Sequence, residues 1–146
     1  MANLNINEFT AEVNRWIDAV DFGVSDIVQE MLKSVHHDLV MGSPVDTGRF
    51  RGNWQVTFDR IPLHSLNRYD KDGNATIAEG NAEIAKILQR GAAVTTVYFS
   101  NMLIYANALE YGHSQQAPNG VVGIVALRLR SYFADAVRKS RSKNAL

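Results

Sequence analysis

The chain has 146 residues, no cysteine, and equal numbers of basic and acidic side chains, 15 of each. This length suits one domain with a single water-excluding core, and the lack of cysteine excludes disulfides, thiolate catalysis and cysteine-ligated zinc. No apolar run reaches the roughly 18 residues that a membrane span needs, and the start, MANLNINEF, lacks the pattern of a secretory signal. We therefore expect a single domain over residues 1–146 and no membrane partner.

Charge is unevenly distributed along the chain. Residues 1–48 carry eight acidic side chains against Arg15 and Lys33, whereas residues 125–146 carry six basic ones against Asp135. The two ends could pair within one molecule, or they could bring neighbouring copies together head to tail. The basic C-terminal segment could also bind nucleic acid, although Lys and Arg are common near any helix C-terminus.

Two helices are predicted in the first forty or so residues. Apolar residues recur at helical spacing between residues 9 and 20, with Asn7 as a candidate N-cap. A second apolar face runs through residues 24–39, and Gly42 followed by Pro44 marks its end, because proline cannot continue the helix. The chain must then turn a corner.

After this corner the apolar spacing changes from helical to alternating. Trp54, Val56 and Phe58 alternate with polar residues, which predicts a strand with one buried face. Residues 60–80 are rich in polar residues and are predicted to form a long loop or ribbon. A short helix is predicted over residues 81–90.

The second half of the chain predicts one strand and two helices. Residues 94–100, VTTVYFS, are the most β-rich segment, and residues 105–111 predict a short helix ended by Gly112. A last helix is predicted over residues 122–140, with Val125, Leu129, Phe133 and Val137 on its apolar face. Few strands and no regular alternation of strand and helix indicate an α+β domain. We expect N-terminal helices and a long C-terminal helix packed on a small antiparallel sheet.

The corner has the sequence SPVDTGRFRGNW, from Ser43 to Trp54, and contains the Asp-Thr-Gly triplet of aspartic proteases. A dimeric protease would need two such aspartates sharing a proton. However, this triplet follows a helix, Arg49 replaces the usual small residue, and the chain is too helical for an all-β protease. A turn explains the residues better: Asp46 accepts the backbone N–H of Gly48 or Arg49, and Gly48 supplies a positive φ. Arg49 and Arg51 would then point away from the core.

Residues 70–77, DKDGNATI, begin like a calcium-binding EF-hand loop. The glycine expected at the sixth position is Ala75, and the glutamate expected at the twelfth is Asn81, so we predict a polar turn. The histidines lack the spacing of a metal site, and no glycine-rich loop suits a phosphate. We therefore expect no cofactor and no metal, and no motif argues for an enzyme.

Two separated pieces of the sequence together resemble one known family. SPVDTGRFRGNW is followed about fifty residues later by YANALEYGH, then by a loop with Ala-Pro and a long helix. This order is similar to the tail-component, or tail-completion, family of tailed bacteriophages, small neck proteins in head–tail joining. The resemblance covers residues 43–137. The matching positions are Pro44, Asp46, Thr47, Gly48, Arg49, Arg51, Trp54, Tyr105, Ala106, Leu109, Glu110, Tyr111 and Gly112.

The resemblance implies a non-enzymatic virion protein, assembled in the host cytoplasm, that forms a six- or twelve-fold ring of its own copies around the DNA channel. Head-closure or adaptor proteins would lie above it and the tail terminator or tail tube below, with DNA only as the passing genome. We also expect Arg49 or Arg51 to meet an acidic residue such as Glu110, within or between subunits. Two alternatives remain: a dimeric aspartic protease using Asp46-Thr47-Gly48, and a small nucleic-acid-binding protein using the basic C-terminal helix.

Overall fold

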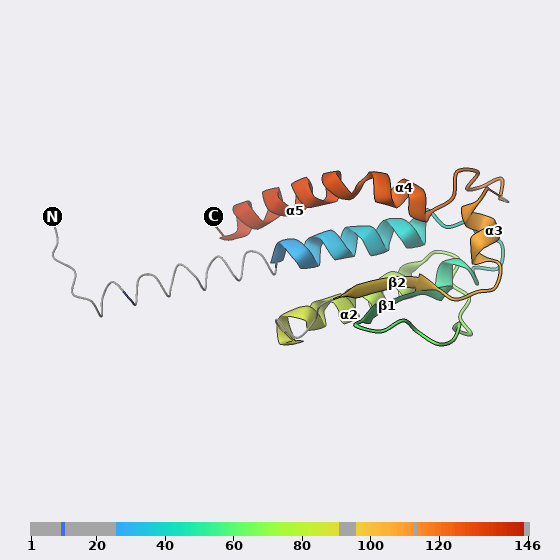
Figure 1. The fold of residues 1–146 in the computed structure, drawn as a ribbon, viewed down its shortest axis with the longest axis horizontal. Helices are drawn as coiled ribbons and strands as arrows, with labels where there is room; N and C mark the ends of the chain where they lie inside the picture. The colour runs from blue at the N-terminus through green and yellow to red at the C-terminus, as the bar shows by residue number, and fades with distance from the viewer. Residues whose placement is uncertain (1–9, 11–25, 91–95, 113, 145–146) are drawn as a thin grey trace.

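The computed structural model describes residues 10, 26–90, 96–112 and 114–144 (Figure 1). A helix runs through residues 26–41, and we call it the central helix. The elements that follow are η1 (Arg51–Asn53), β1 (Trp54–Phe58), α2 (Asn74–Arg90), β2 (Val97–Asn101), α3 (Ala106–Glu110), α4 (Val122–Leu127) and α5 (Leu129–Asn144). These helices and the small antiparallel sheet confirm the α+β class. The helix predicted over residues 9–20 lies, apart from Thr10, outside the described residues.

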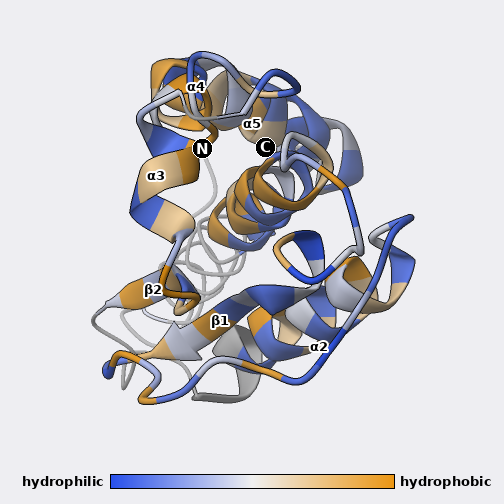
Figure 2. Ribbon diagram, turned by 90° about the vertical axis from the view of Figure 1, so that its right-hand side faces the viewer, coloured by the Kyte–Doolittle hydropathy of each residue, from blue (hydrophilic) through white to orange (hydrophobic). Residues whose placement is uncertain are grey.

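The central helix lies between two layers, with α4 and α5 on one side and the sheet with α2 on the other (Figures 1 and 2). The main core cluster joins these layers, and its buried members are Val35, Leu39, Val40, Phe50, Trp54, Leu103, Ala117, Val121, Val125 and Tyr132. A second cluster of Val56, Phe58 and Ile84 packs α2 against β1. The C-terminal helices and the sheet therefore share one apolar interior, organised around the central helix.

The sheet has the alternation that the sequence predicts. β1 pairs with β2 in antiparallel register, from Trp54 opposite Asn101 to Phe58 opposite Val97. Trp54, Val56 and Phe58 are buried, and the residues between them are half-exposed. The second strand lies at residues 97–101 instead of 94–100, and residues 94–95 fall outside the described part of the chain.

The loop predicted over residues 60–80 is shorter than expected, because α2 begins at Asn74. The buried carboxylate of Asp70 initiates this helix by accepting the backbone N–H groups of Gly73 at 3.1 Å and Thr76 at 2.8 Å. Aspartate just before a helix satisfies amides that have no partner inside the helix. Gly80, the last residue of the predicted loop, lies within α2, where a Cβ atom would come 2.0 Å from His36 Nε2. The glycine serves close packing instead of a turn.

The predicted C-terminal helix is divided into α4 and α5 by Arg128. The buried face of α5 consists of Tyr132, Ala136 and Ser140, whereas Leu129 and Phe133 are 41% and 53% exposed. The prediction of Leu129 and Phe133 as core residues is therefore wrong. Small side chains allow close packing on the central helix, so hydrophobicity alone selected the wrong face. Among the described residues, no helix combines the length and apolar character needed to cross a bilayer.

Candidate functional site

The corner after the central helix depends on Gly48, which has the predicted positive φ, at 87°. Its carbonyl accepts the backbone N–H groups of Gly52 and Asp70, both at 2.9 Å. A Cβ atom at Gly48 would lie 2.6 Å from the backbone nitrogen of Lys71. Only glycine combines this conformation with this close approach of two chain segments.

Asp46 does not close the turn, which corrects the sequence-based prediction. Within the part of the chain that the structure describes, the Asp46 carboxylate is exposed and makes no hydrogen bond. The hydroxyl oxygen of Thr47 accepts the backbone N–H of Arg49 instead, at 3.3 Å. Asp46 also lies in an irregular segment, whereas a protease triplet would follow a buried strand.

Arg51 does not point away from the core as predicted, because its guanidinium joins three backbone segments. It donates to the carbonyl oxygens of Lys71 at 2.8 Å, Met41 at 3.0 Å and Ser43 at 3.0 Å. These carbonyls belong to the loop before α2, the end of the central helix and the corner. Arg49 is half-buried, and its carbonyl accepts the side-chain amide of Asn53 at 2.6 Å. The side chain of Arg51 and the backbone of Arg49 therefore belong to the framework of the corner.

Trp54 connects β1 to the central helix through Ser43. The indole N–H donates to the Ser43 hydroxyl oxygen at 2.7 Å, and that hydroxyl donates to the carbonyl of Leu39 at 2.6 Å. The Trp54 ring also meets Phe50 edge to face, with centroids 5.9 Å apart. A buried aromatic ring with its polar atom bonded holds the corner at a fixed angle to the helix.

Glu110 holds the start of α4 instead of meeting Arg49 or Arg51. Its carboxylate accepts the backbone N–H groups of Val121 at 2.8 Å, Val122 at 2.7 Å and Gly123 at 2.9 Å. Burial alone would raise the pKa of Glu110, but these donors outweigh it and hold the pKa below its ordinary value. The ion pair predicted between Glu110 and the corner arginines is therefore not formed within this chain.

The two motif pieces meet in space. The rings of Phe50 and Tyr105 have centroids 6.3 Å apart. A cavity of about 280 Å³ lies between the corner and α3, lined by Pro44, Val45, Asp46, Thr47, Gly48, Arg49, Phe50, Tyr105, Leu109, Ser114 and Gln116. Gln116 closes one side, because its side-chain amide both accepts from and donates to the backbone of Val45, each at 2.8 Å. Sequence reasoning missed Gln116, which only looked like part of a polar loop.

The remaining predicted residues surround α3. Ala106 and Leu109 are half-buried and pack against the main core, and Gly112 ends the helix with a φ of 88°. Tyr111 is 81% exposed. Ile104, just before α3, is fully exposed. Large apolar side chains on both flanks of α3 therefore face outward beside the cavity.

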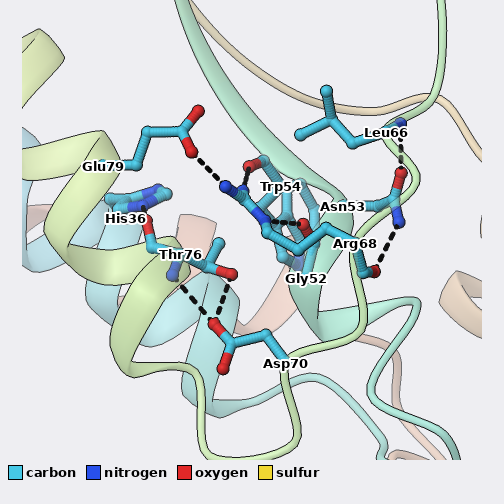
Figure 3. Close-up of polar contacts among 9 residues, drawn as sticks. All are labelled: His36, Gly52, Asn53, Trp54, Leu66, Arg68, Asp70, Thr76 and Glu79. Atoms are coloured by element: carbon cyan, nitrogen blue, oxygen red, sulfur yellow. Dashed lines mark hydrogen bonds and ion pairs between the residues drawn. The ribbon is translucent and has the colours of Figure 1, made fainter.

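A polar network holds the loop before α2 against the corner (Figure 3). Arg68 donates to the carbonyl of Gly52 at 2.7 Å and forms an ion pair with Glu79. The side-chain oxygen of Asn53 accepts the backbone N–H of Leu66 at 2.6 Å. Asp70, the first ligand of the supposed calcium loop, is engaged by α2, and the described residues contain no group of three potential metal ligands.

The acidic and basic segments pair with each other within this chain. Arg128, Lys139 and Lys143 lie 3.5, 3.8 and 3.4 Å from Asp38, Glu30 and Asp26, respectively. Tyr132 also donates its hydroxyl to Asp38, and burial together with this carboxylate raises the pKa of Tyr132 to about 12. Of the two arrangements that the charge distribution allowed, the intramolecular one is present.

Comparisons with protein-family models, with curated proteins and with solved structures find no match to this chain.

Proposed function

We propose that this chain is a non-enzymatic structural protein of a tailed bacteriophage, forming a ring in the neck of the virion that joins the head to the tail. One observation carries the proposal. The two sequence pieces that resemble the tail-completion family, residues 43–54 and 105–112, line one cavity although about fifty residues separate them. A chance resemblance in two separate pieces of sequence would not be expected to bring both pieces to the same cavity. Their meeting in space therefore supports the view that they form one functional unit.

The chemistry of this unit supports a structural role. Arg51 binds three carbonyls, Glu110 binds three amides, and Trp54 is bonded to Ser43. Each of these polar groups is used to fix the backbone. Asp46, the residue that a protease would need, is exposed in a loop. The geometry thus gives the protease alternative no support.

The exposed apolar residues beside the cavity support an interface. Ile104, Tyr105 and Tyr111 belong to the motif segment or adjoin it, and they present apolar surface outward. Aromatic and aliphatic side chains of this kind are enriched where proteins meet. The partners would be further copies of the chain, head-closure or adaptor proteins on one side, and the tail terminator or tail tube on the other.

The nucleic-acid alternative is weakened by pairing within the chain. Three basic residues of the C-terminal segment, Arg128, Lys139 and Lys143, already lie beside carboxylates of the central helix. Phosphate binding depends on basic groups that can release counterions from the nucleic acid. In a ring, DNA would pass through the channel as the genome.

The proposal is tested by placing charge on the flanks of α3. In phage carrying Ile104→Asp or Tyr111→Asp, we expect full heads and separate tails to accumulate, counted by electron microscopy. Asn107→Asp, at an exposed polar position of the same helix, should leave joined particles at the wild-type level. Circular dichroism of each purified variant reports whether the fold is intact. Normal joining by folded Ile104→Asp and Tyr111→Asp variants would contradict the proposed interface.

A further inference from the structure

β2 is an edge strand whose outer backbone groups have no hydrogen-bond partner among the described residues. The backbone N–H of Asp59 donates to the carbonyl of Thr96 at 2.9 Å, in the register of the sheet. Bonded and non-bonded pairs alternate along an antiparallel ladder, so this bond fixes the direction of every other backbone group. The N–H and C=O groups of Val97, Phe99 and Asn101 therefore point away from β1.

The opposite edge of the sheet confirms this alternation. The carbonyl of Trp54, which lies opposite Asn101, accepts a hydrogen bond from the guanidinium of Arg68 at 3.4 Å. Trp54 thus turns its carbonyl away from β2, toward the loop before α2. The same loop covers more of this edge, since the carbonyl of His64 accepts from the Gln55 side chain at 2.9 Å. The outer edge of β1 is protected, in contrast to that of β2.

Proteins usually protect an edge strand with charge, proline or a bulge. β2 has the sequence VYFSN, which contains no charged residue and no proline. It pairs with β1 in unbroken register, without a bulge. Each of its residues is half-exposed. In Figure 2, β1 lies between β2 and α2. This edge has the features of a strand that is completed by another polypeptide segment.

We propose that β2 binds an extended strand formed by residues 2–7 of a second copy of this chain. This segment, ANLNIN, is uncharged and alternates apolar residues with asparagine. Such alternation is typical of a strand with one apolar and one polar face. The same segment therefore offers both the hydrogen-bonding groups and the two-faced character that the β2 edge requires.

The side chains of the two strands are complementary. On β2, Val97 and Phe99 pack against the apolar clusters, and Tyr98 and Ser100 lie on the other face. Neighbouring strands place like faces together. Leu4 and Ile6 of the incoming strand extend the apolar face beside Val97 and Phe99, and the asparagines extend the polar face.

The donating segment and the accepting edge are different surfaces, so each copy gives one strand and receives another. Such a heterologous contact closes into a ring when the rotation between copies permits. This ring consequence rests on the proposed function, and the strand exchange supplies the contact between neighbouring copies in that ring.

The absence of cysteine permits a direct test with the full-length chain. An isotopically heavy Asn5→Cys protein is mixed with a light Ser100→Cys protein under mild oxidation. In a second mixture, light Tyr98→Cys replaces Ser100→Cys, to test a pairing shifted by two residues along β2. Adjacent strands bring Cβ atoms within disulfide range. We expect a disulfide-linked dimer of one heavy and one light chain. Ser142→Cys, at an exposed position of α5, replaces Ser100→Cys as the control and should give none.

Amide hydrogen exchange tests the backbone pairing independently. In the assembled protein, the N–H groups of Val97 and Phe99 should exchange at least about tenfold more slowly than in the Leu4→Asn/Ile6→Asn variant. The N–H groups of Tyr98 and Ser100 already face β1 and should be protected in both proteins. Equal exchange at Val97 and Phe99 in the two proteins would overturn the proposal.

Three other outcomes would overturn it as well. In the double variant Asn5→Cys/Ser100→Cys, a disulfide that forms only within one chain would mean that the strand comes from the same copy. Dimers of Ser100→Cys with itself, without heavy Asn5→Cys, would mean that two β2 edges pair. Absence of any cross-link would remove the strand exchange. Neck rings without cross-links would refute only this contact, whereas cross-linked oligomers absent from the neck would refute only the proposed function.

Discussion

The polar residues of the two motif pieces act by holding backbone segments in place. Arg51 connects three segments through their carbonyls, and Glu110 connects α3 to the start of α4 through three amides. Hydrogen bonds that involve a charged group are stronger than neutral ones. Sequence reasoning selected these residues, but it assigned the turn to Asp46 and an ion pair to Glu110. Both assignments were wrong because the sequence does not show which backbone groups lie near these side chains.

Replacing Arg51 should cost far more stability than replacing Asp46. Arg51→Gln removes the charged donors of three backbone carbonyls, those of Lys71, Met41 and Ser43, and we expect a loss of about 2 kcal/mol in the free energy of unfolding. Asp46→Ala is the matched control in the same corner, and it should stay within about 0.5 kcal/mol of wild type. Denaturant unfolding measures both. A larger loss for Asp46→Ala than for Arg51→Gln would mean that the carboxylate closes the turn after all.

Replacing Glu110 should loosen the start of α4. Glu110→Gln keeps one oxygen acceptor but removes the charge that three amides share, and we expect a loss of about 1 kcal/mol. Glu83→Gln removes the charge of a partly exposed carboxylate of α2 that pairs with Lys86, and it should change stability by less than about 0.5 kcal/mol. Thermal unfolding of the two variants, compared at pH 7, would show no difference if the Glu110 contacts contributed nothing.

His36 gives stability a defined dependence on pH. The ring is buried, and Nε2 lies 2.9 Å from the carbonyl oxygen of Thr76. Burial lowers the pKa of His36 below 6.5; the charge of Arg68 lowers it further, and the charge of Glu79 raises it. A lowered pKa in the folded state means that the unfolded chain binds the proton first. The contribution of neutral His36 to the free energy of unfolding is therefore fully present above pH 6.5. It is lost as the pH falls toward the folded-state pKa, by at most about 1.4 kcal/mol per pH unit.

This dependence is measured by unfolding at pH 7.5 and pH 5.5. Wild type and His37→Asn, which alters the exposed neighbouring histidine, should both lose stability at the lower pH. His36→Gln should lose less than either, although its absolute stability will be lower. An equal loss in all three proteins would show that His36 does not titrate in this way.

At the scale of elements, the sequence predicted most of the fold. The end of the central helix, β1, α3 and the α+β class follow from apolar spacing and from glycine and proline positions. The start of α2 was missed because it depends on the Asp70 side chain, and Gly80 resembles a helix breaker. The buried face of α5 was missed because its fit to the central helix depends on small residues, which periodicity does not reveal.

The central helix and α5 should be coupled through their charges. Lys143→Glu places a second negative charge beside Asp26, whose side chain is only 14% exposed. We expect a loss of about 1 kcal/mol at low salt, with recovery in the double variant Lys143→Glu/Asp26→Lys. Arg141→Glu, two residues before Lys143 at an exposed position of the same helix, is the control. A double-mutant cycle that gives no interaction energy between Asp26 and Lys143 would show that this ion pair does not stabilise the fold.

At the scale of the whole molecule, two surfaces are left uncovered by the residues that the structure describes. One comprises the apolar residues that flank α3, and the other is the outer edge of β2. These surfaces suit a component that functions by assembly, and the sequence alone indicated this role only through its resemblance to the tail-completion family.

The most direct measurement is electron cryomicroscopy of phage particles that carry a tagged version of this chain. We expect a closed ring at the junction of head and tail, built from six or twelve copies that contact their neighbours through the residues around α3. A virion in which the tag is absent, or lies away from the neck, would contradict it.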